Sequence, residues 1–202
     1  MGRPATQGFA QVVLASKEIC GEVGLVIRRQ AIIGASVVGA GIIALLAQLK
    51  LSLPGLALPI TGQTLAVALV SGWGGAWVGV PAVLLYIAAA AAGWPVLSGG
   101  RGGWDVVTGP SLGYLAGFVA SARVIPFFLG RWGRTRWVWV WLAIEAGSVC
   151  VLGFGALGLI ARGMSPTDAF TTGVWPFLPG DLVKSSFAAT LLWLTARRVA
   201  RR

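Results

Sequence analysis

The longest charge-free stretch of the chain sets the strongest limit on its fold. Residues 51–100 contain no Asp, Glu, Lys or Arg. A membrane-spanning helix needs about 20 apolar residues, so this stretch is too long for one span and just long enough for two. Residues 72–75, Gly-Trp-Gly-Gly, provide a natural break, because glycine favours a turn and tryptophan favours the membrane interface. We therefore predict spans at 58–71 and 76–93.

The composition extends this argument to the whole chain. Of the 202 residues, 56% are hydrophobic and 11% are charged, whereas roughly a quarter of a soluble domain is charged. We therefore predict an all-α integral membrane protein, a single bundle of six transmembrane helices. The first three expected spans are 31–49, 58–71 and 76–93. Residues 110–122 continue into the fourth span, the fifth is 137–161, and the last runs from 181 to 197.

The N-terminal part differs from the rest. Residues 1–30 mix charged side chains with short apolar clusters and lack the continuous apolar core of a secretory signal peptide. Part of 12–27 is expected to form an interfacial helix before the first span. The chain therefore divides into a cytoplasmic or interfacial segment, 1–30, and a six-helix membrane domain, 31–202.

Basic residues are distributed unevenly between the two sides of such a bundle. With six spans, twelve Lys and Arg fall on the side of the two termini and three on the opposite side. Because cytoplasmic loops carry an excess of Lys and Arg, we expect both termini in the cytoplasm. The twelve are Arg3, Lys17, Arg28, Arg29, Arg123, Arg131, Arg134, Arg136, Arg197, Arg198, Arg201 and Arg202, and the three are Lys50, Arg101 and Arg162.

Several classes of function are disfavoured. The net charge of +10 is scattered between apolar runs, so we expect no nucleic-acid binding and attribute the charge to topology. The chain has no His, and Cys20 and Cys150 lie far apart, which argues against a metal site. No Ser/His/Asp set, catalytic carboxylate pair or nucleotide motif is present. We therefore expect a binding or transport subunit without a cofactor, not an enzyme.

One pair of opposite charges stands at the start of the last span. Asp181 and Lys184 are three residues apart in Pro-Gly-Asp-Leu-Val-Lys, so on a helix they share a face. Charged side chains in a span are costly and usually face a bundle interior or a polar cavity, which indicates a binding site. A structural role is equally open, since Asp181 suits a helix N-cap and Lys184 could extend to the headgroups.

Two further polar groups are expected on the same outer side. Gln63, at the mouth of the second span, offers both a donor and an acceptor, although it could simply bond a neighbouring helix. Arg101 has two glycines on each side, so its loop can fold closely around something small, although it could equally be an exposed turn. Together with Asp181 and Lys184, these groups could converge on one small polar ligand. Tyr86, in the third span, ordinarily finds one hydroxyl partner.

Two other features concern helix packing. Ala31, Ala35 and Gly39 recur every four residues in the first span, and such a stripe of small residues lets another helix approach closely. The stripe suits packing inside the bundle and contact with a separate subunit about equally. Glu145, about two turns into the fifth span, is expected to pair with Arg123 or with an arginine of the basic loop that precedes this span.

Five segments together resemble the BioY family of biotin transporters in their order and spacing, over about residues 31–196. The glycine–arginine loop and the Gly-Asp-x-x-Lys signature are the specific ones. The segments are Leu58-Pro59-Ile60-Thr61-Gly62-Gln63-Thr64-Leu65, Leu84-Leu85-Tyr86, Gly99-Gly100-Arg101-Gly102-Gly103, Gly109-Pro110-Ser111-Leu112-Gly113-Tyr114 and Pro179-Gly180-Asp181-Leu182-Val183-Lys184.

The resemblance implies a six-helix biotin-capture subunit, the S component of an energy-coupling-factor (ECF) transporter in a prokaryotic cell membrane. Members of this family normally join a transmembrane coupling protein and two ATPases, and some act without them. The family's binding positions fall on Arg101, Asp181 and Lys184, with Tyr86 and Gln63 as further candidates. Its partner-facing stripe falls on Ala31, Ala35 and Gly39, where the family pattern has alanine at the third position.

Biotin would suit this set of groups chemically. Its ureido N–H groups need an acceptor such as Asp181, while its ureido carbonyl and its carboxylate need donors such as Arg101 and Lys184. Its apolar ring and chain could pack on Tyr86 or Trp94. The alternatives are a related capture subunit for another vitamin or small polar ligand and, behind it, a membrane enzyme or scaffold.

Overall fold

The computed structural model describes residues 27–51 and 60–200. The interfacial helix expected within 12–27 lies, apart from its last residue, outside this range.

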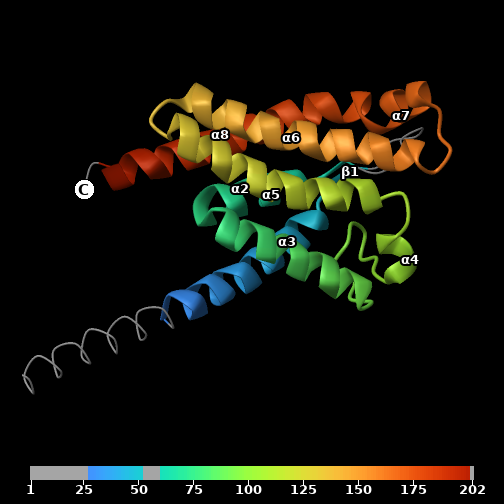
Figure 1. The fold of residues 1–202 in the computed structure, drawn as a ribbon, viewed down its shortest axis with the longest axis horizontal. Helices are drawn as coiled ribbons and strands as arrows, with labels where there is room; N and C mark the ends of the chain where they lie inside the picture. The colour runs from blue at the N-terminus through green and yellow to red at the C-terminus, as the bar shows by residue number, and fades with distance from the viewer. Residues whose placement is uncertain (1–26, 52–59, 201–202) are drawn as a thin grey trace, which may run out of the picture.

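The described chain is built almost entirely from helices, as the sequence predicts (Figure 1). Among the described residues, three helices are long and apolar enough to cross a membrane: the first helix (Ile27–Ala47), α5 (Leu112–Trp132) and α6 (Trp137–Ile160). The helix α3 (Ala76–Ala91) is also apolar but shorter. The number of spans remains a prediction. The long helices are the first helix (Ile27–Ala47), α2 (Gln63–Gly74), α3 (Ala76–Ala91), α5 (Leu112–Trp132), α6 (Trp137–Ile160) and α8 (Leu178–Ala200), and the short ones are α4 (Trp104–Val107), α7 (Pro166–Gly173) and the 3-10 helix η1 (Trp175–Phe177).

The expected span at 58–71 begins later than predicted. Ile60–Thr61 forms the short strand β2, which pairs antiparallel with β1 (Lys50–Leu51), Lys50 opposite Thr61. The helix α2 starts only at Gln63, because the backbone of β2 is extended and hydrogen-bonded to β1. This pairing holds the first turn of α2 beside the end of the first helix.

The C-terminal half also differs from the sequence-based boundaries. Within the stretch expected to be a loop, Ser165 caps α7 by accepting a hydrogen bond from the Asp168 N–H. The last helix begins at Leu178, so Asp181 lies inside its first turn and not at the N-cap. The N-cap alternative for Asp181 is therefore wrong.

Among the described elements from α2 to α8, α5 and α6 pack against each other most extensively, and they lie side by side in Figure 1. Glycine permits this approach: a Cβ added at Gly117 would lie 2.6 Å from the Val151 Cα. Gly117 therefore lies in a helix–helix seam, where a small residue lets the two backbones approach closely.

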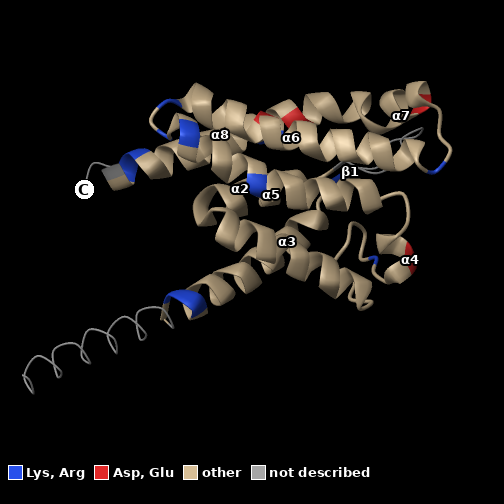
Figure 2. Cartoon of the chain, in the orientation of Figure 1, with Lys and Arg blue, Asp and Glu red and all other residues tan. Residues whose placement is uncertain are grey.

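Charged side chains gather unequally at the two ends of the bundle (Figure 2). Arginines cluster at the end that holds the start of the first helix, the α5–α6 loop and the C-terminal turns of α8. The opposite end holds α4, α7 and the β1–β2 pair, with few basic residues. This asymmetry supports the expected orientation, which remains a prediction.

Candidate ligand-binding site

A pocket lies at the end of the bundle opposite the arginine cluster, between α2, α5, α6, α8 and the glycine–arginine loop. Its cavity volume in this structure is about 80 Å³. Its polar lining is Thr61, Gln63, Thr64, Ser98, Arg101, Ser111, Asp181 and Lys184, and its other lining is Leu97, Val106, Tyr114, Leu115, Phe118, Val151, Leu152 and Phe177.

Asp181 and Lys184 share one face of α8, as their spacing predicts. The Asp181 residue is only 5% exposed. The Lys184 Nζ lies 3.9 Å from Asp181 Oδ1, but it donates at 2.6 Å to Thr64 Oγ1 and at 3.2 Å to the Thr61 carbonyl oxygen. The ammonium group is thus held at the start of α2 and does not reach toward headgroups.

A second polar layer lies behind Asp181. The Ser185 hydroxyl is within hydrogen-bond distance of the Asp181 carbonyl oxygen, 2.6 Å away, and of Glu145 Oε1, 2.5 Å away. The expected pairing of Glu145 with an arginine is therefore not seen: in the described part of the chain its carboxyl group contacts α8. Helix α6 packs against α8, which turns Glu145 toward Ser185.

The loop that carries Arg101 is a tight turn. The Leu97 N–H donates to the Arg101 carbonyl oxygen at 2.9 Å, and Gly99 and Gly100 have φ of 76° and 67°, values that L side chains rarely adopt. The Arg101 Nε donates to the Ser98 carbonyl oxygen at 3.1 Å, which turns the guanidinium back over the pocket.

Gln48, at the end of the first helix, clamps this loop and was not singled out in the sequence. Its Nε2 donates to the carbonyl oxygens of Val96 and Leu97 at 3.2 and 3.3 Å, and its Oε1 accepts from the Gly100 N–H at 3.1 Å. Glutamine carries both a donor and an acceptor, which suits it to bridging backbone groups on both arms of a turn. A lone glutamine near a helix end gives no such signal in sequence.

Gln63 and Tyr86 form a connected pair, but only Gln63 lines the pocket. The Gln63 Nε2 donates to the Tyr86 hydroxyl, while its Oε1 accepts from Thr61 Oγ1 at 2.8 Å. Tyr86 is 1% exposed and belongs to the hydrophobic core. Its place in the structure is thus behind Gln63, where it fixes the orientation of the amide.

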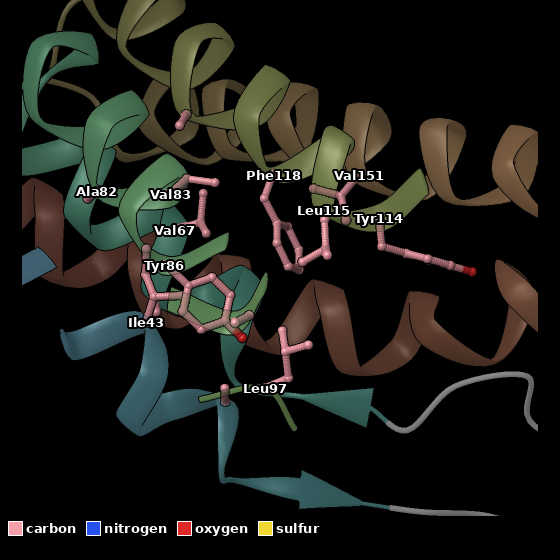
Figure 3. Packing of buried hydrophobic residues seen from close by; sticks show 14 of the residues in the cluster. Ile43, Val67, Ala82, Val83, Tyr86, Leu97, Tyr114, Leu115, Phe118 and Val151 are labelled. Carbon is pink, nitrogen blue, oxygen red and sulfur yellow. The ribbon is translucent and has the colours of Figure 1, made fainter. Parts of the chain in front are cut away.

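The apolar wall comes mainly from α5 and α6. Leu115 and Phe118 project from α5 toward Leu97 and Tyr86 (Figure 3). The Tyr114 hydroxyl donates at 2.6 Å to the Gly173 carbonyl oxygen, so its ring is fixed against the end of α7. Trp94, suggested as an apolar contact, is 64% exposed and does not line the pocket. Sequence reasoning did not single out Tyr114 and Phe118 as pocket residues, because in the sequence they look like ordinary core positions.

The arrangement suits binding of a ligand that is polar at some points and apolar elsewhere. A buried carboxylate, two cationic groups and an amide surround an apolar cavity. The described residues contain no group of three or more His, Cys, Asp or Glu able to hold a metal ion.

The small-residue stripe of the first helix divides between two environments. Ala31 and Ala35 are exposed, whereas Gly39 is buried. A Cβ added at Gly39 would lie 2.7 Å from Val70 Cγ1 and 3.0 Å from the Ala82 Cβ. Gly39 therefore packs within the bundle, whereas Ala31 and Ala35 leave an exposed surface, and their contact with a separate subunit stays a prediction.

Comparison with known proteins gives a consistent result. The chain is 37% identical over 164 residues to the biotin transporter BioY of Rhodobacter capsulatus, covering 73% of this chain and 81% of that protein. It is 37% identical over 150 residues to the biotin transporter BioY of Rhizobium etli, covering 70% and 79%. A crystal structure of the S-component for biotin from an ECF-type ABC transporter matches with a TM-score of 0.76 and 24% identity, covering 84% of this chain and 93% of that one.

The relatives thus share sequence over most of the chain, and the solved structure shares its fold. Residues 23–201 also match the profile of one family over nearly the whole described length. The chain belongs to the BioY family.

Proposed function

We propose that this protein captures biotin from the outer side of a prokaryotic cell membrane, as the S component of an ECF transporter. The carrying observation is the pocket in which Asp181, Lys184 and Arg101 surround an apolar cavity. Relatives at 37% identity are biotin transporters, which supports the choice of ligand.

The pocket offers a complement to each part of biotin. The Asp181 carboxylate accepts from the ureido N–H groups, and charge assistance strengthens these hydrogen bonds. Lys184 and Arg101 supply donors for the ureido carbonyl and the carboxylate. The thiophane ring and chain pack on the wall formed by Leu115, Phe118 and their neighbours.

We further propose six spans with cytoplasmic termini, and assembly with a transmembrane coupling protein and two ATPases. The described arginine cluster supports the orientation. The exposed Ala31 and Ala35 support a helix–helix contact with the coupling protein, because small side chains let backbones approach closely.

Binding is tested by isothermal titration and by thermal melting of detergent-purified protein with biotin and with a panel of other water-soluble vitamins. A ligand that binds the folded state raises the melting temperature by mass action. We expect biotin alone to stabilise the protein and to titrate with one site per chain. Stabilisation by another vitamin and not by biotin would contradict the choice of ligand.

The role of the partners is tested by biotin uptake in cells that lack their own biotin transporter. Uptake should require the coupling protein and ATPases if the chain is an obligate S component. Equal uptake with and without them would show that the chain transports alone, while the binding assay would still report on ligand capture.

A further inference from the structure

A second groove lies at the arginine-rich end of the bundle, far from the pocket of Asp181. It has a volume of about 690 Å³ and lies between the end of α2, the α5–α6 loop and the last turns of α8. The lining side chains that matter here are Trp73, Arg134, Thr135, Thr195, Arg197 and Val199.

Side-chain contacts fix the walls of this groove. The Trp73 Nε1 donates at 3.0 Å to Thr195 Oγ1, which ties α2 to α8. The Trp193 Nε1 donates at 3.0 Å to the Thr135 carbonyl oxygen, which ties α8 to the α5–α6 loop. The Arg197 guanidinium carbon lies 4.6 Å from the centroid of the Trp193 ring, a cation–π contact that orients this arginine.

Two positive charges therefore converge on the groove without an acidic partner in the described chain. No Asp or Glu lines it, and the salt bridge found among residues 27–51 and 60–200 is that of Lys184 with Asp181. Arg134 is half-buried in its loop, and burial lowers the pKa of its guanidinium because desolvation disfavours the charged form. An anion bound between Arg134 and Arg197 would offset that cost.

The surroundings specify which anion fits. Tryptophan side chains concentrate at the level of lipid headgroups, so Trp73 and Trp193 place the groove at the membrane interface. Arginine forks match phosphate oxygens in pairs, and basic pockets between helices on the cytoplasmic side suit anionic headgroups. Exposed Val199 adds an apolar contact at the rim.

We propose that the groove binds the phosphate of an anionic phospholipid of the cytoplasmic leaflet, between Arg134 and Arg197. The proposal rests on the proposed orientation of the chain, but not on the identity of the ligand in the outer pocket. Lipid bound there links the ends of α2 and α8 through one headgroup.

Lipid binding is measured on the full-length protein by native mass spectrometry and by melting in detergent supplemented with phosphatidylglycerol or phosphatidylcholine. We expect tighter binding and a larger rise in melting temperature with phosphatidylglycerol. The affinity for phosphatidylglycerol should fall about tenfold or more in the double variant Arg134→Gln/Arg197→Gln. The reason is that each basic residue near an anionic headgroup contributes roughly a factor of five to the affinity.

A matched control removes the same charge from the same end of the molecule. Arg131→Gln/Arg198→Gln changes two exposed arginines that do not line the groove, and it should retain the preference for phosphatidylglycerol. Biotin titration of both double variants should give wild-type affinity, which checks folding and separates this proposal from that for the outer pocket.

Four results would overturn the proposal. The first is an equal rise in melting temperature with phosphatidylglycerol and phosphatidylcholine, and the second is an equal loss of phosphatidylglycerol affinity in the two double variants. The third is a rise in melting temperature with soluble glycerol phosphate equal to that with phosphatidylglycerol, which would mean a site for free phosphate. The fourth is unchanged lipid binding with lost assembly of the coupling complex in Arg134→Gln/Arg197→Gln, which would make the groove a protein-docking surface.

Discussion

The Lys184 ammonium is oriented by neutral groups more closely than by its acidic neighbour. It lies 2.6 Å from Thr64 Oγ1 and 3.9 Å from Asp181 Oδ1. At the longer distance the two charges attract each other without a good hydrogen bond, so the carboxylate keeps acceptor capacity toward a ligand. The two residues thus present one acceptor and one donor to the pocket.

Asp181→Asn should lower biotin affinity by about tenfold or more. Asn replaces one acceptor oxygen by an amide and removes the charge that strengthens the bonds to the ureido N–H groups. Charge-assisted hydrogen bonds of this kind contribute roughly 1.5–3 kcal/mol each. Isothermal titration measures it, and Asp105→Asn, an exposed carboxylate outside the pocket, serves as the control. Equal affinity in wild type and Asp181→Asn would remove Asp181 from the binding set.

Thr64→Val should weaken biotin binding about threefold to tenfold. Valine keeps the shape of threonine but removes the oxygen that anchors the Lys184 Nζ, and a typical hydrogen bond contributes about 0.5–1.5 kcal/mol net. The control is Thr171→Val, an exposed threonine on α7. An affinity unchanged by Thr64→Val would show that Lys184 needs no such anchor.

At the scale of secondary-structure elements, the first helix serves two surfaces. Its last turns pack on α2 and α3 through Ile43 and Ala47, which are fully buried. Nearer its start, Ala31 and Ala35 are exposed. The same stripe therefore contributes to the core at Gly39 and leaves room for a partner one and two turns earlier.

Two substitutions on this stripe should separate its roles. Ala35→Trp should block assembly with the coupling protein and leave biotin binding intact, because the bulk falls on an exposed surface. Gly39→Val should lower the melting temperature, since its Cβ would lie 2.7 Å from Val70 Cγ1 and overpacked cores lose roughly 1–3 kcal/mol. Pull-down of the coupling complex and thermal melting measure these effects, and the reverse pattern would refute the division.

The elements also show how far sequence reasoning reaches. Apolar runs and glycine breaks predicted most of the long helices, because in a membrane the backbone must satisfy its own hydrogen bonds. The start of α2 was misplaced because the β1–β2 pairing depends on two segments meeting in space. The spacing of Asp181 and Lys184 predicted a shared face, whereas Gln48 and the Ser185–Glu145 contact depend on tertiary packing that a local pattern does not encode.

At the scale of the whole molecule, charge separates the two ends of the bundle (Figure 2). The candidate ligand pocket and the lipid groove lie at opposite ends, with the membrane-length helices between them. Each end therefore meets a different chemical environment if the chain spans the membrane as proposed.

Single-cysteine labelling of intact cells tests this orientation. In a chain with Cys20 and Cys150 replaced, Arg136→Cys should react with an impermeant maleimide only after permeabilisation, and Thr167→Cys should react in intact cells. Both positions are exposed, and neither has positive φ. If Arg136→Cys reacted in intact cells and Thr167→Cys did not, the orientation of the chain would be the reverse of the one proposed.

The hydrogen bonds of Gln48 tie the end of the first helix to the glycine–arginine loop. The described part of this helix, Ile27–Ala47, has 21 residues and is roughly 30 Å long, and Gln48 lies just beyond its C-terminal end. If the proposed coupling protein moves this helix at the alanines, the Gln48 hydrogen bonds would pass the movement to the loop that carries Arg101. Gln48→Ala should disconnect the two motions: purified protein would still bind biotin, while partner-dependent biotin release, followed with radiolabelled biotin, would slow.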